Sequence, residues 1–336
     1  MIEVLIFAAK ALLILTCILA VIITIAVLAS KASQKPELEV EPLHKKYQDL
    51  DLFLKANMSS KEELKAEKKK IKKQEKDEKK SQAIHERVFV VDFDGDVQAS
   101  QVSNLREEIT SILQVATPQD EVIIKLESPG GVVHGYGLAT SQLLRLKEAN
   151  VPYTVCVDKV AASGGYMMAS TANKIIAAPF SIVGSIGVVA QVPNFNRVLK
   201  KYDVDYKEYT AGDYKRTVSL VGEISKEGET HFVGRLNDTH QLFKTHVQKY
   251  RPAADLSQVA NGDHWYGEEA LKLGLVDKIQ TSDDYILEKF KQNKSIYHIK
   301  HSTKQSLSEK ISDLLGMTGL KLFHRITTSL EKNRFI

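Results

Sequence analysis

Three glycine-rich turns hold the residues of this sequence that are best suited to chemistry. They are residues 127–132 (ESPGGV), 161–166 (AASGGY) and 183–188 (VGSIGV). Glycine lets backbone N–H groups approach a ligand closely, so two such turns near each other can present two N–H groups to one oxyanion. None of the turns matches the phosphate-binding pattern GxxxxGK[ST], and the first two do not match GxGxxG. A nucleotide site therefore has little support.

Ser163 is the candidate nucleophile. It lies at an expected strand-to-helix turn, where its Oγ would be exposed and the helix N-terminus would favour developing negative charge. The alternative is a serine that only caps the helix.

A serine nucleophile needs a base. The sequence has ten histidines, but none lies in a pattern typical of a triad; His134 follows the first turn and is either a site residue or an ordinary surface or core histidine. Lys215, in residues 210–217 (TAGDYKRT), can replace histidine if its amine is held neutral. The alternative for Lys215 is a solvated loop lysine, and periodicity alone does not select it.

The elements that must position these residues alternate between strands and helices. This alternation predicts βαβ units with parallel strands, an α/β fold. Strands are expected over residues 88–93, 121–127, 152–158 and 174–178, and helices over 102–114, 135–149, from 163 onward, 226–250 and 267–273.

The chain before the expected α/β region has two different parts. Residues 11–30 carry no charge, and twenty helical residues cover the bilayer core of about 30 Å. We expect a membrane anchor over residues 1–37, the alternative being a cleaved signal peptide. Residues 38–86 form a charged connector, in which 61–80 hold ten lysines and six acids. This run is either a solvated spacer or a surface for anionic lipid.

Composition narrows the class of protein. The chain has 336 residues, 43% hydrophobic and 26% charged, which is typical of a globular protein. Two cysteines exclude a disulfide scaffold. The net charge of +4 equals that of residues 61–80 alone, which argues against a nucleic-acid-binding face. The histidines and cysteines offer no clustered metal ligands, so we expect neither a metal nor a cofactor.

Six short motifs together resemble the signal peptide peptidase A family of serine proteases, and within it the membrane-anchored SohB-type branch with a lysine-rich N-terminal extension. The motifs are SPGG at 128–131, AASGGY at 161–166, VGSIG at 183–187, GDYKR at 212–216, WYG at 265–267 and GLVD at 274–277. The resemblance covers nearly the whole chain. Each motif is weak alone, and the order and spacing of the six are specific.

The resemblance implies a ClpP/crotonase-type fold of repeated ββα units over residues 87–290. Residues 307–330 have helical apolar spacing, so a helical extension is expected over 291–336. It implies a Ser–Lys dyad of Ser163 and Lys215, with the N–H groups of Gly131 and Gly164 as the oxyanion hole. Ser185 matches a serine that orients the lysine; the alternative is a simple turn serine.

The expected function is a membrane-anchored serine endopeptidase acting on extended or apolar peptides, such as leftover signal peptides or misfolded chains. The ClpP-type histidine branch does not fit, because position 188 is valine. A crotonase-like acyl-CoA enzyme and an inactive membrane scaffold are the alternatives. Relatives with one catalytic unit per chain assemble as rings, in some of which the lysine reaches a neighbouring subunit, so a homo-oligomer is expected. The expected location is a bacterial-type inner membrane. The side of the membrane on which the catalytic domain lies stays open. The lysines after the apolar segment favour the cytoplasmic side, whereas the best-known relatives act on the outer side.

Overall fold

The computed structural model describes residues 37–60 and 86–302, together with Lys10, Lys65 and Lys69. Residues Val40–Lys300 form one compact unit, and a second unit comprises Met1–Glu39 and His301–Ile336. The expected membrane segment 11–30 lies outside the described residues, as do Cys17, nearly all of the lysine-rich run 61–80 and the C-terminal stretch from 303. Among the residues that are described, no helix is long and apolar enough to cross a membrane.

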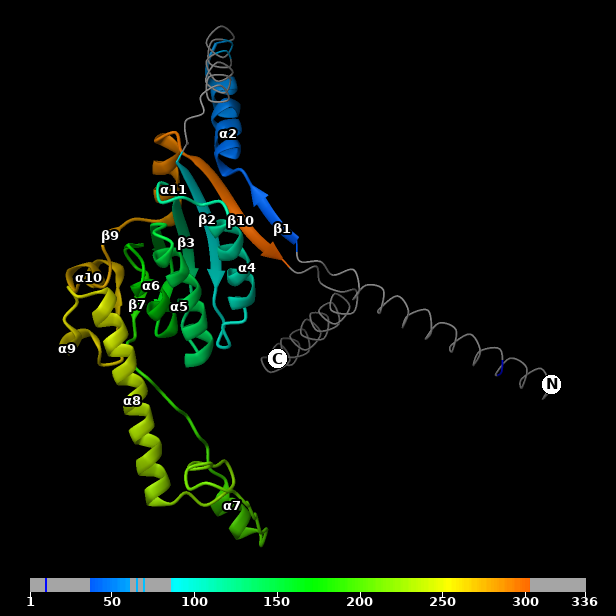
Figure 1. Cartoon of the computed structure of the whole chain (residues 1–336), viewed down its shortest axis with the longest axis vertical. Helices are drawn as coiled ribbons and strands as arrows, with labels where there is room; N and C mark the ends of the chain where they lie inside the picture. Colours follow the sequence, from blue (N-terminus) through cyan, green and yellow to red (C-terminus); the bar gives the residue numbers. More distant parts are fainter. Residues whose placement is uncertain (1–9, 11–36, 61–64, 66–68, 70–85, 303–336) are drawn as a thin grey trace, which may run out of the picture. The chain divides into compact units, whose positions relative to one another are not determined.

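Two sheets organise the part of the chain that the structure describes (Figure 1). The larger sheet has the order β1-β10-β2-β3-β4-β6-β9, and from β10 to β9 its neighbouring strands pair in parallel. In the smaller sheet, β5 pairs in parallel with β7, which pairs antiparallel with β8. The strands are β1 (Glu37–Glu41), β2 (Arg87–Asp94), β3 (Glu121–Glu127), β4 (Tyr153–Val157), β5 (Val160–Ala162), β6 (Lys174–Ala177), β7 (Ile182–Gly184), β8 (His264–Tyr266), β9 (Lys278–Ile279) and β10 (Ser295–Ser302).

Helices cover both faces of the larger sheet. Along β2, Val91 and Phe93 belong to a core cluster shared with α4 and α5, whereas Val88 and Val90 belong to a second cluster with α11. Such two-sided burial explains why the parallel strands read as continuous apolar runs. The described helices are α2 (Leu43–Met58), α4 (Val102–Leu113), α5 (Val133–Glu148), α6 (Gly164–Ser170), α7 (Asn196–Lys201), α8 (Lys226–Tyr250), α9 (Leu256–Val259), α10 (Gly267–Lys272) and α11 (Ser282–Lys291).

These elements confirm the expected α/β class. Regular structure also extends beyond the expected domain limits of 87 and 290. Residues 295–302, placed by the sequence in a helical extension, form β10 instead, and Ile296 pairs with Val88 of β2. The physical reason is that Ile296 and Ile299 are buried. Part of the expected connector is also folded, because it contains β1 and α2, and Leu43 and Tyr47 of α2 pack against the second core cluster.

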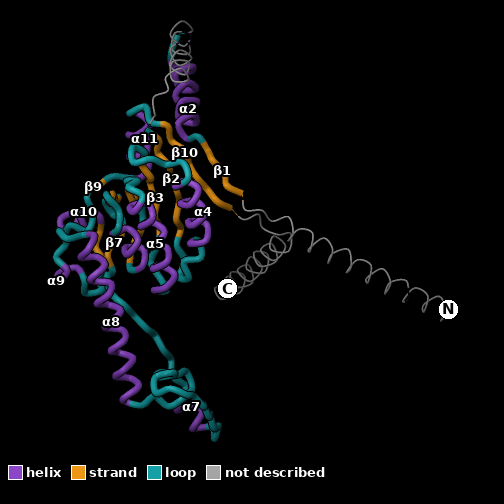
Figure 2. The backbone as a smooth tube through the Cα atoms, in the orientation of Figure 1, coloured by secondary structure: helices purple, strands orange, loops and turns teal. Residues whose placement is uncertain are grey.

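The chain between β7 and α8 is mostly loop, with α7 as its helix (Figure 2). We call residues 188–225 the arm. Its ends are tied together, since Asn194 Nδ2 donates to the carbonyls of Ser219 and Gly222 at 2.8 and 2.9 Å and Asn196 Nδ2 donates to Val221 O at 2.9 Å. Many large apolar side chains of the arm are exposed: Val189, Val192, Phe195, Val198, Tyr202, Val204, Tyr206, Tyr209, Tyr214 and Leu220.

Candidate active site

Ser163 connects β5 to α6 in an unusual backbone conformation. Its φ is 52° and its ψ is −118°, a region that residues other than glycine rarely adopt. The conformation is held by hydrogen bonds on both sides, from Ser163 N to Gly184 O at 2.8 Å and from Met167 N to Ser163 O at 2.9 Å. Although Ser163 occupies the N-cap position of α6, its side chain makes no capping hydrogen bond. The hydroxyl is therefore not used in the way that a purely structural capping serine would use it.

The first glycine-rich turn lies directly against Ser163. Gly130 has a φ of +88°, and a Cβ there would lie 2.7 Å from Ser163 Cβ and from Gly164 N. A Cβ on Gly131 would lie 2.1 Å from Val97 O. Gly164 is the first residue of α6, where N–H groups have no partner within the helix. The two turns thus bring Gly131 and Gly164 to the neighbourhood of the candidate nucleophile.

A cavity of about 950 Å³ contains four of the five predicted site residues, namely Ser163, Gly131, Gly164 and Ser185. Ser185 has a φ of 52°, and its N–H donates to Asp263 O at 2.7 Å. Its hydroxyl lies 3.5 Å from Gly262 O. Ser185 follows Gly184, whose carbonyl receives the N–H of Ser163, so the third turn is directly connected to the candidate nucleophile.

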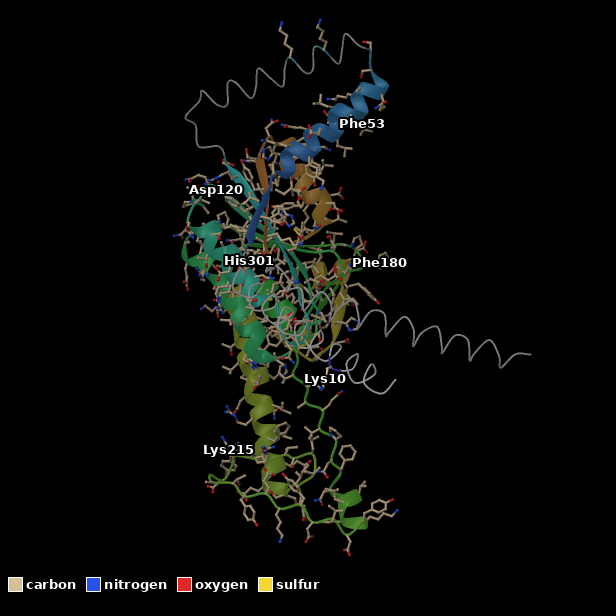
Figure 3. All side chains as sticks on the ribbon, turned by 90° about the vertical axis from the view of Figure 1, so that its right-hand side faces the viewer. Lys10, Phe53, Asp120, Phe180, Lys215 and His301 are labelled. Atoms are coloured by element: carbon tan, nitrogen blue, oxygen red, sulfur yellow. The ribbon has the colours of Figure 1, made fainter. Side chains whose placement is uncertain are left out.

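Lys215, the fifth predicted residue, does not line this cavity. It is exposed on the arm, and Figure 3 shows it beside the end of α8 that lies farther from the sheets. Its neighbour Tyr214 stacks on His231 of α8, while His240 of α8 lines the cavity. His231 and His240 are nine positions apart in the helix, which corresponds to about 13.5 Å along its axis. Within one chain the structure does not bring Lys215 to Ser163.

Two histidines that the sequence patterns did not single out line the cavity from α8. The Nε2–H of His240 donates to Ile186 O at 3.1 Å, and that of His246 donates to Met167 O at 3.2 Å. Burial lowers the pKa of His246, so its neutral form is favoured. These bonds join α8 to the third glycine-rich turn, which holds Ile186, and to α6, which holds Met167. By contrast, His134 is exposed and does not line the cavity. The sequence signal that could have pointed to His240 is its spacing from Phe243, because residues three positions apart share one face of a helix.

The rest of the cavity lining is largely apolar. The arm contributes Val188 and Val189, and the polar side chains of the lining are Ser163, Ser185, Thr239, His240, His246 and Asn261. Further apolar residues of the lining are Val97, Pro129, Val132, Val133, Met167, Leu242 and Phe243.

An α/β fold that presents a serine at the N-terminus of a helix, next to glycine turns and an apolar cavity, is the arrangement of a serine-type peptidase. Comparisons with known proteins agree. The model for the peptidase family S49 N-terminal region matches residues 1–143, and the model for peptidase family S49 matches residues 145–296. The chain belongs to peptidase family S49, and to its SohB-type branch.

The relatives include a probable protease SohB from Haemophilus influenzae, 45% identical over 98% of this chain and 96% of its own length. A probable protease SohB from Buchnera aphidicola of Acyrthosiphon pisum is 48% identical over 70% of this chain and 71% of its own length. Among solved structures, a mutant of the 1510-N membrane-bound stomatin-specific protease aligns with a TM-score of 0.39 and 16% identity, over 62% of this chain and 86% of that chain. Membership of the family sets aside the acyl-CoA enzyme and the inactive scaffold.

Proposed function

We propose that this protein is a membrane-anchored serine endopeptidase in which Ser163 is the nucleophile and Lys215 of a neighbouring copy is the base. The observation that supports this most directly is the separation of the two residues within one chain. Ser163 lines the cavity beside Gly131 and Gly164, whereas Lys215 is exposed on the arm. A second copy would supply the missing amine.

In the proposed reaction, neutral Lys215 removes the proton from Ser163 Oγ, which attacks the peptide carbonyl carbon. The resulting oxyanion is held by the N–H groups of Gly131 and Gly164. When the C–N bond breaks, protonated Lys215 gives its proton to the leaving amine. Water, activated by the same lysine, then releases the acyl group from Ser163, with Ser185 orienting the lysine amine.

The arm supports the sharing of the site between copies. Its two ends are joined by the hydrogen bonds of Asn194 and Asn196, so it is a folded element rather than an unstructured loop. Its apolar residues are exposed, and Tyr209 is 90% exposed. Exposed apolar side chains in such number are typical of a surface that associates with a partner, and a homo-oligomer would cover them.

The proposed substrates are extended or apolar peptides, such as leftover signal peptides or misfolded chains. The apolar cavity lining next to Ser163 supports this preference. The small sheet β5-β7-β8, set beside a parallel sheet, supports a ClpP/crotonase-type arrangement of the peptidase domain. Residues 11–30 would anchor the protein in the lipid bilayer of a bacterial-type inner membrane; the side on which the peptidase lies is a separate question that a topology reporter answers.

Complementation between two inactive variants tests the shared site. The full chain in detergent is assayed with apolar fluorogenic peptides, alone and as Ser163→Ala or Lys215→Ala. Both variants should be inactive. Co-expression of the two in equal amounts should restore activity at about a quarter of the sites, because each restored site needs one intact residue from each neighbour in a symmetric ring.

The possible results separate the parts of this proposal. Activity that survives Ser163→Ala would show that another residue is the nucleophile. Two inactive variants that stay inactive when co-assembled would place both dyad residues in the same subunit.

A further inference from the structure

A chain of hydrogen bonds runs behind the first glycine-rich turn and ends at a buried tyrosine. Tyr136, in α5, has no exposed surface. Its hydroxyl donates to Asp96 O at 2.7 Å and lies 2.5 Å from Ser128 Oγ. Ser128 Oγ in turn accepts a hydrogen bond from Gly130 N at 3.0 Å.

The direction of this chain is fixed by chemistry. A carbonyl oxygen only accepts, so the single hydrogen of the Tyr136 hydroxyl is committed to Asp96 O. The Ser128 hydroxyl must therefore donate to Tyr136, which leaves a lone pair on Ser128 Oγ for the N–H of Gly130. The order is Gly130 N–H to Ser128 to Tyr136 to Asp96. Each buried group has a partner, and a change at Tyr136 is transmitted to the turn.

The ring of Tyr136 reaches the second glycine-rich turn as well. A Cβ on Gly164 would lie 2.4 Å from Tyr136 Cγ, so the ring packs directly against the backbone of Gly164. A Cβ on Gly165 would lie 2.7 Å from Ser128 O. Tyr136 therefore contacts Gly164 through its ring and the turn that holds Gly131 through its hydroxyl.

We propose that Tyr136, acting through Ser128, is a positioning residue that sets the two N–H groups of the oxyanion hole relative to each other. This inference rests on the proposed function, in which Gly131 and Gly164 hold the oxyanion. Hydrogen bonds to an oxyanion need donors within about 2.7–3.1 Å of it. A small shift of the turn therefore weakens binding of the transition state more than binding of the substrate. Loss of the Tyr136 hydroxyl should therefore lower kcat and leave KM almost unchanged.

The test compares Tyr136→Phe with Tyr153→Phe in the full chain in detergent. Tyr153 is a matched control, because it is also fully buried and its hydroxyl donates at 2.8 Å to Thr171 Oγ1, away from the glycine turns. Ser128→Ala is a second variant in the same hydrogen-bond chain. Each variant is assayed for kcat, KM and thermal unfolding. Each is also assayed for inhibition by a peptide aldehyde, which forms a tetrahedral adduct with the serine, and by the matching peptide alcohol, which does not.

Tyr136→Phe should lower kcat about tenfold, less than the roughly 10²–10³-fold loss that removal of a whole donor causes. It should weaken inhibition by the peptide aldehyde by a similar factor and leave inhibition by the peptide alcohol unchanged. Ser128→Ala should behave alike, and the double variant should be no worse than the more affected single variant, since both break one chain. Tyr153→Phe should lower stability and keep kcat.

An equal effect of Tyr136→Phe on aldehyde and alcohol would overturn the inference, as would kinetics that match those of Tyr153→Phe. An inactive wild type, or an active Ser163→Ala, would instead contradict the proposed function itself. The two failures are therefore distinguishable in one set of assays.

Discussion

Tyr214 and His231 stack face to face, with ring centroids 3.9 Å apart and planes 4° from parallel. This stack joins the loop that carries Lys215 to the first turns of α8. Nearby, Ser225 caps α8 by accepting from Gly228 N at 3.0 Å. The position of Lys215 on the arm is thus determined by an aromatic contact with the same helix that lines the cavity farther along.

Removal of the stack should reduce activity through the lysine. An aromatic pair contributes about 0.5–1.5 kcal/mol beyond its buried area, so we expect His231→Ala to lower kcat by roughly two- to tenfold. His231→Phe keeps a ring at this position and should retain most of the activity. Steady-state kinetics of the two variants, with sedimentation to confirm equal assembly, checks this. Equal losses in both would show that the imidazole matters for a reason other than stacking.

Gly164→Ala should lower catalytic activity much more strongly than it lowers the stability of the fold. Its Cβ would lie 2.4 Å from Tyr136 Cγ, and the displacement that follows would move an N–H group of the proposed oxyanion hole. We expect kcat to fall by about 10²-fold or more. Gly234→Ala is the control, because a Cβ there has no heavy atom within 4 Å and the residue lies in α8. Alanine in a helix should raise stability by about 0.5–1 kcal/mol. Peptide hydrolysis and thermal unfolding of both variants provide the comparison.

Arg251, which is buried, forms an ion pair with the partly exposed Asp277 that ties the end of α8 to β6. The guanidinium donates to both carboxylate oxygens, at 2.9 and 2.7 Å, and Asp277 Oδ2 also accepts from Ile175 N at 2.7 Å. Asp277→Ala leaves a buried guanidinium and the buried Ile175 N–H without this acceptor. Because the Asp277 side chain is itself 34% exposed, we expect a loss of about 1.5–3 kcal/mol of unfolding free energy. Asp238→Ala breaks an exposed pair with Arg235 and should cost less than about 1 kcal/mol. Urea unfolding measures both, and similar losses would contradict the role of burial.

Two histidines should give opposite pH dependences of stability. Burial lowers the pKa of His246, which faces Met167 and lies near Lys249. The unfolded chain therefore binds this proton more readily, and the stability from neutral His246 is lost as the pH falls below about 6.5. The contact with Asp92 raises the pKa of His298, aided by Glu41 and opposed by Lys125. Its contribution is present below about 6.5 and is lost as the pH rises through the raised pKa.

Thermal unfolding between pH 5 and 8 compares wild type with His246→Gln and His298→Gln. The advantage of wild type over His246→Gln should grow as the pH rises, and its advantage over His298→Gln should shrink. Differences that do not change with pH would show that neither histidine titrates in the way described.

Much of the peptidase unit could be predicted from local sequence. The strand over 121–127 and the helix over 226–250 have the predicted limits, because a buried apolar run and a long periodic segment are strong local signals. The strand at 295–302 was missed: its place depends on pairing with β2, about two hundred residues earlier, which no local pattern reports.

The glycine turns that hold Gly131 and Gly164 were visible in the sequence, and the structure places both turns beside Ser163; the role of their N–H groups stays a proposal. The candidate site was not predictable where the role depends on long-range contact. Tyr136 reads as one more core residue of a helix, and only the folded chain brings its hydroxyl to Ser128 and Asp96. Likewise, the spacing of Ser163 and Lys215 does not reveal that one chain keeps them apart.

The backbone of Ser163 has a consequence for how this protein can change. A φ of 52° with a ψ of −118° is easy for glycine and costs a serine of the order of 1–3 kcal/mol. Glycine at position 163 would thus relieve this strain and remove the proposed nucleophile. If Ser163 is the nucleophile, as we propose, selection for stability alone would work against selection for activity at this position. Screens for thermostable variants should therefore hold position 163 constant.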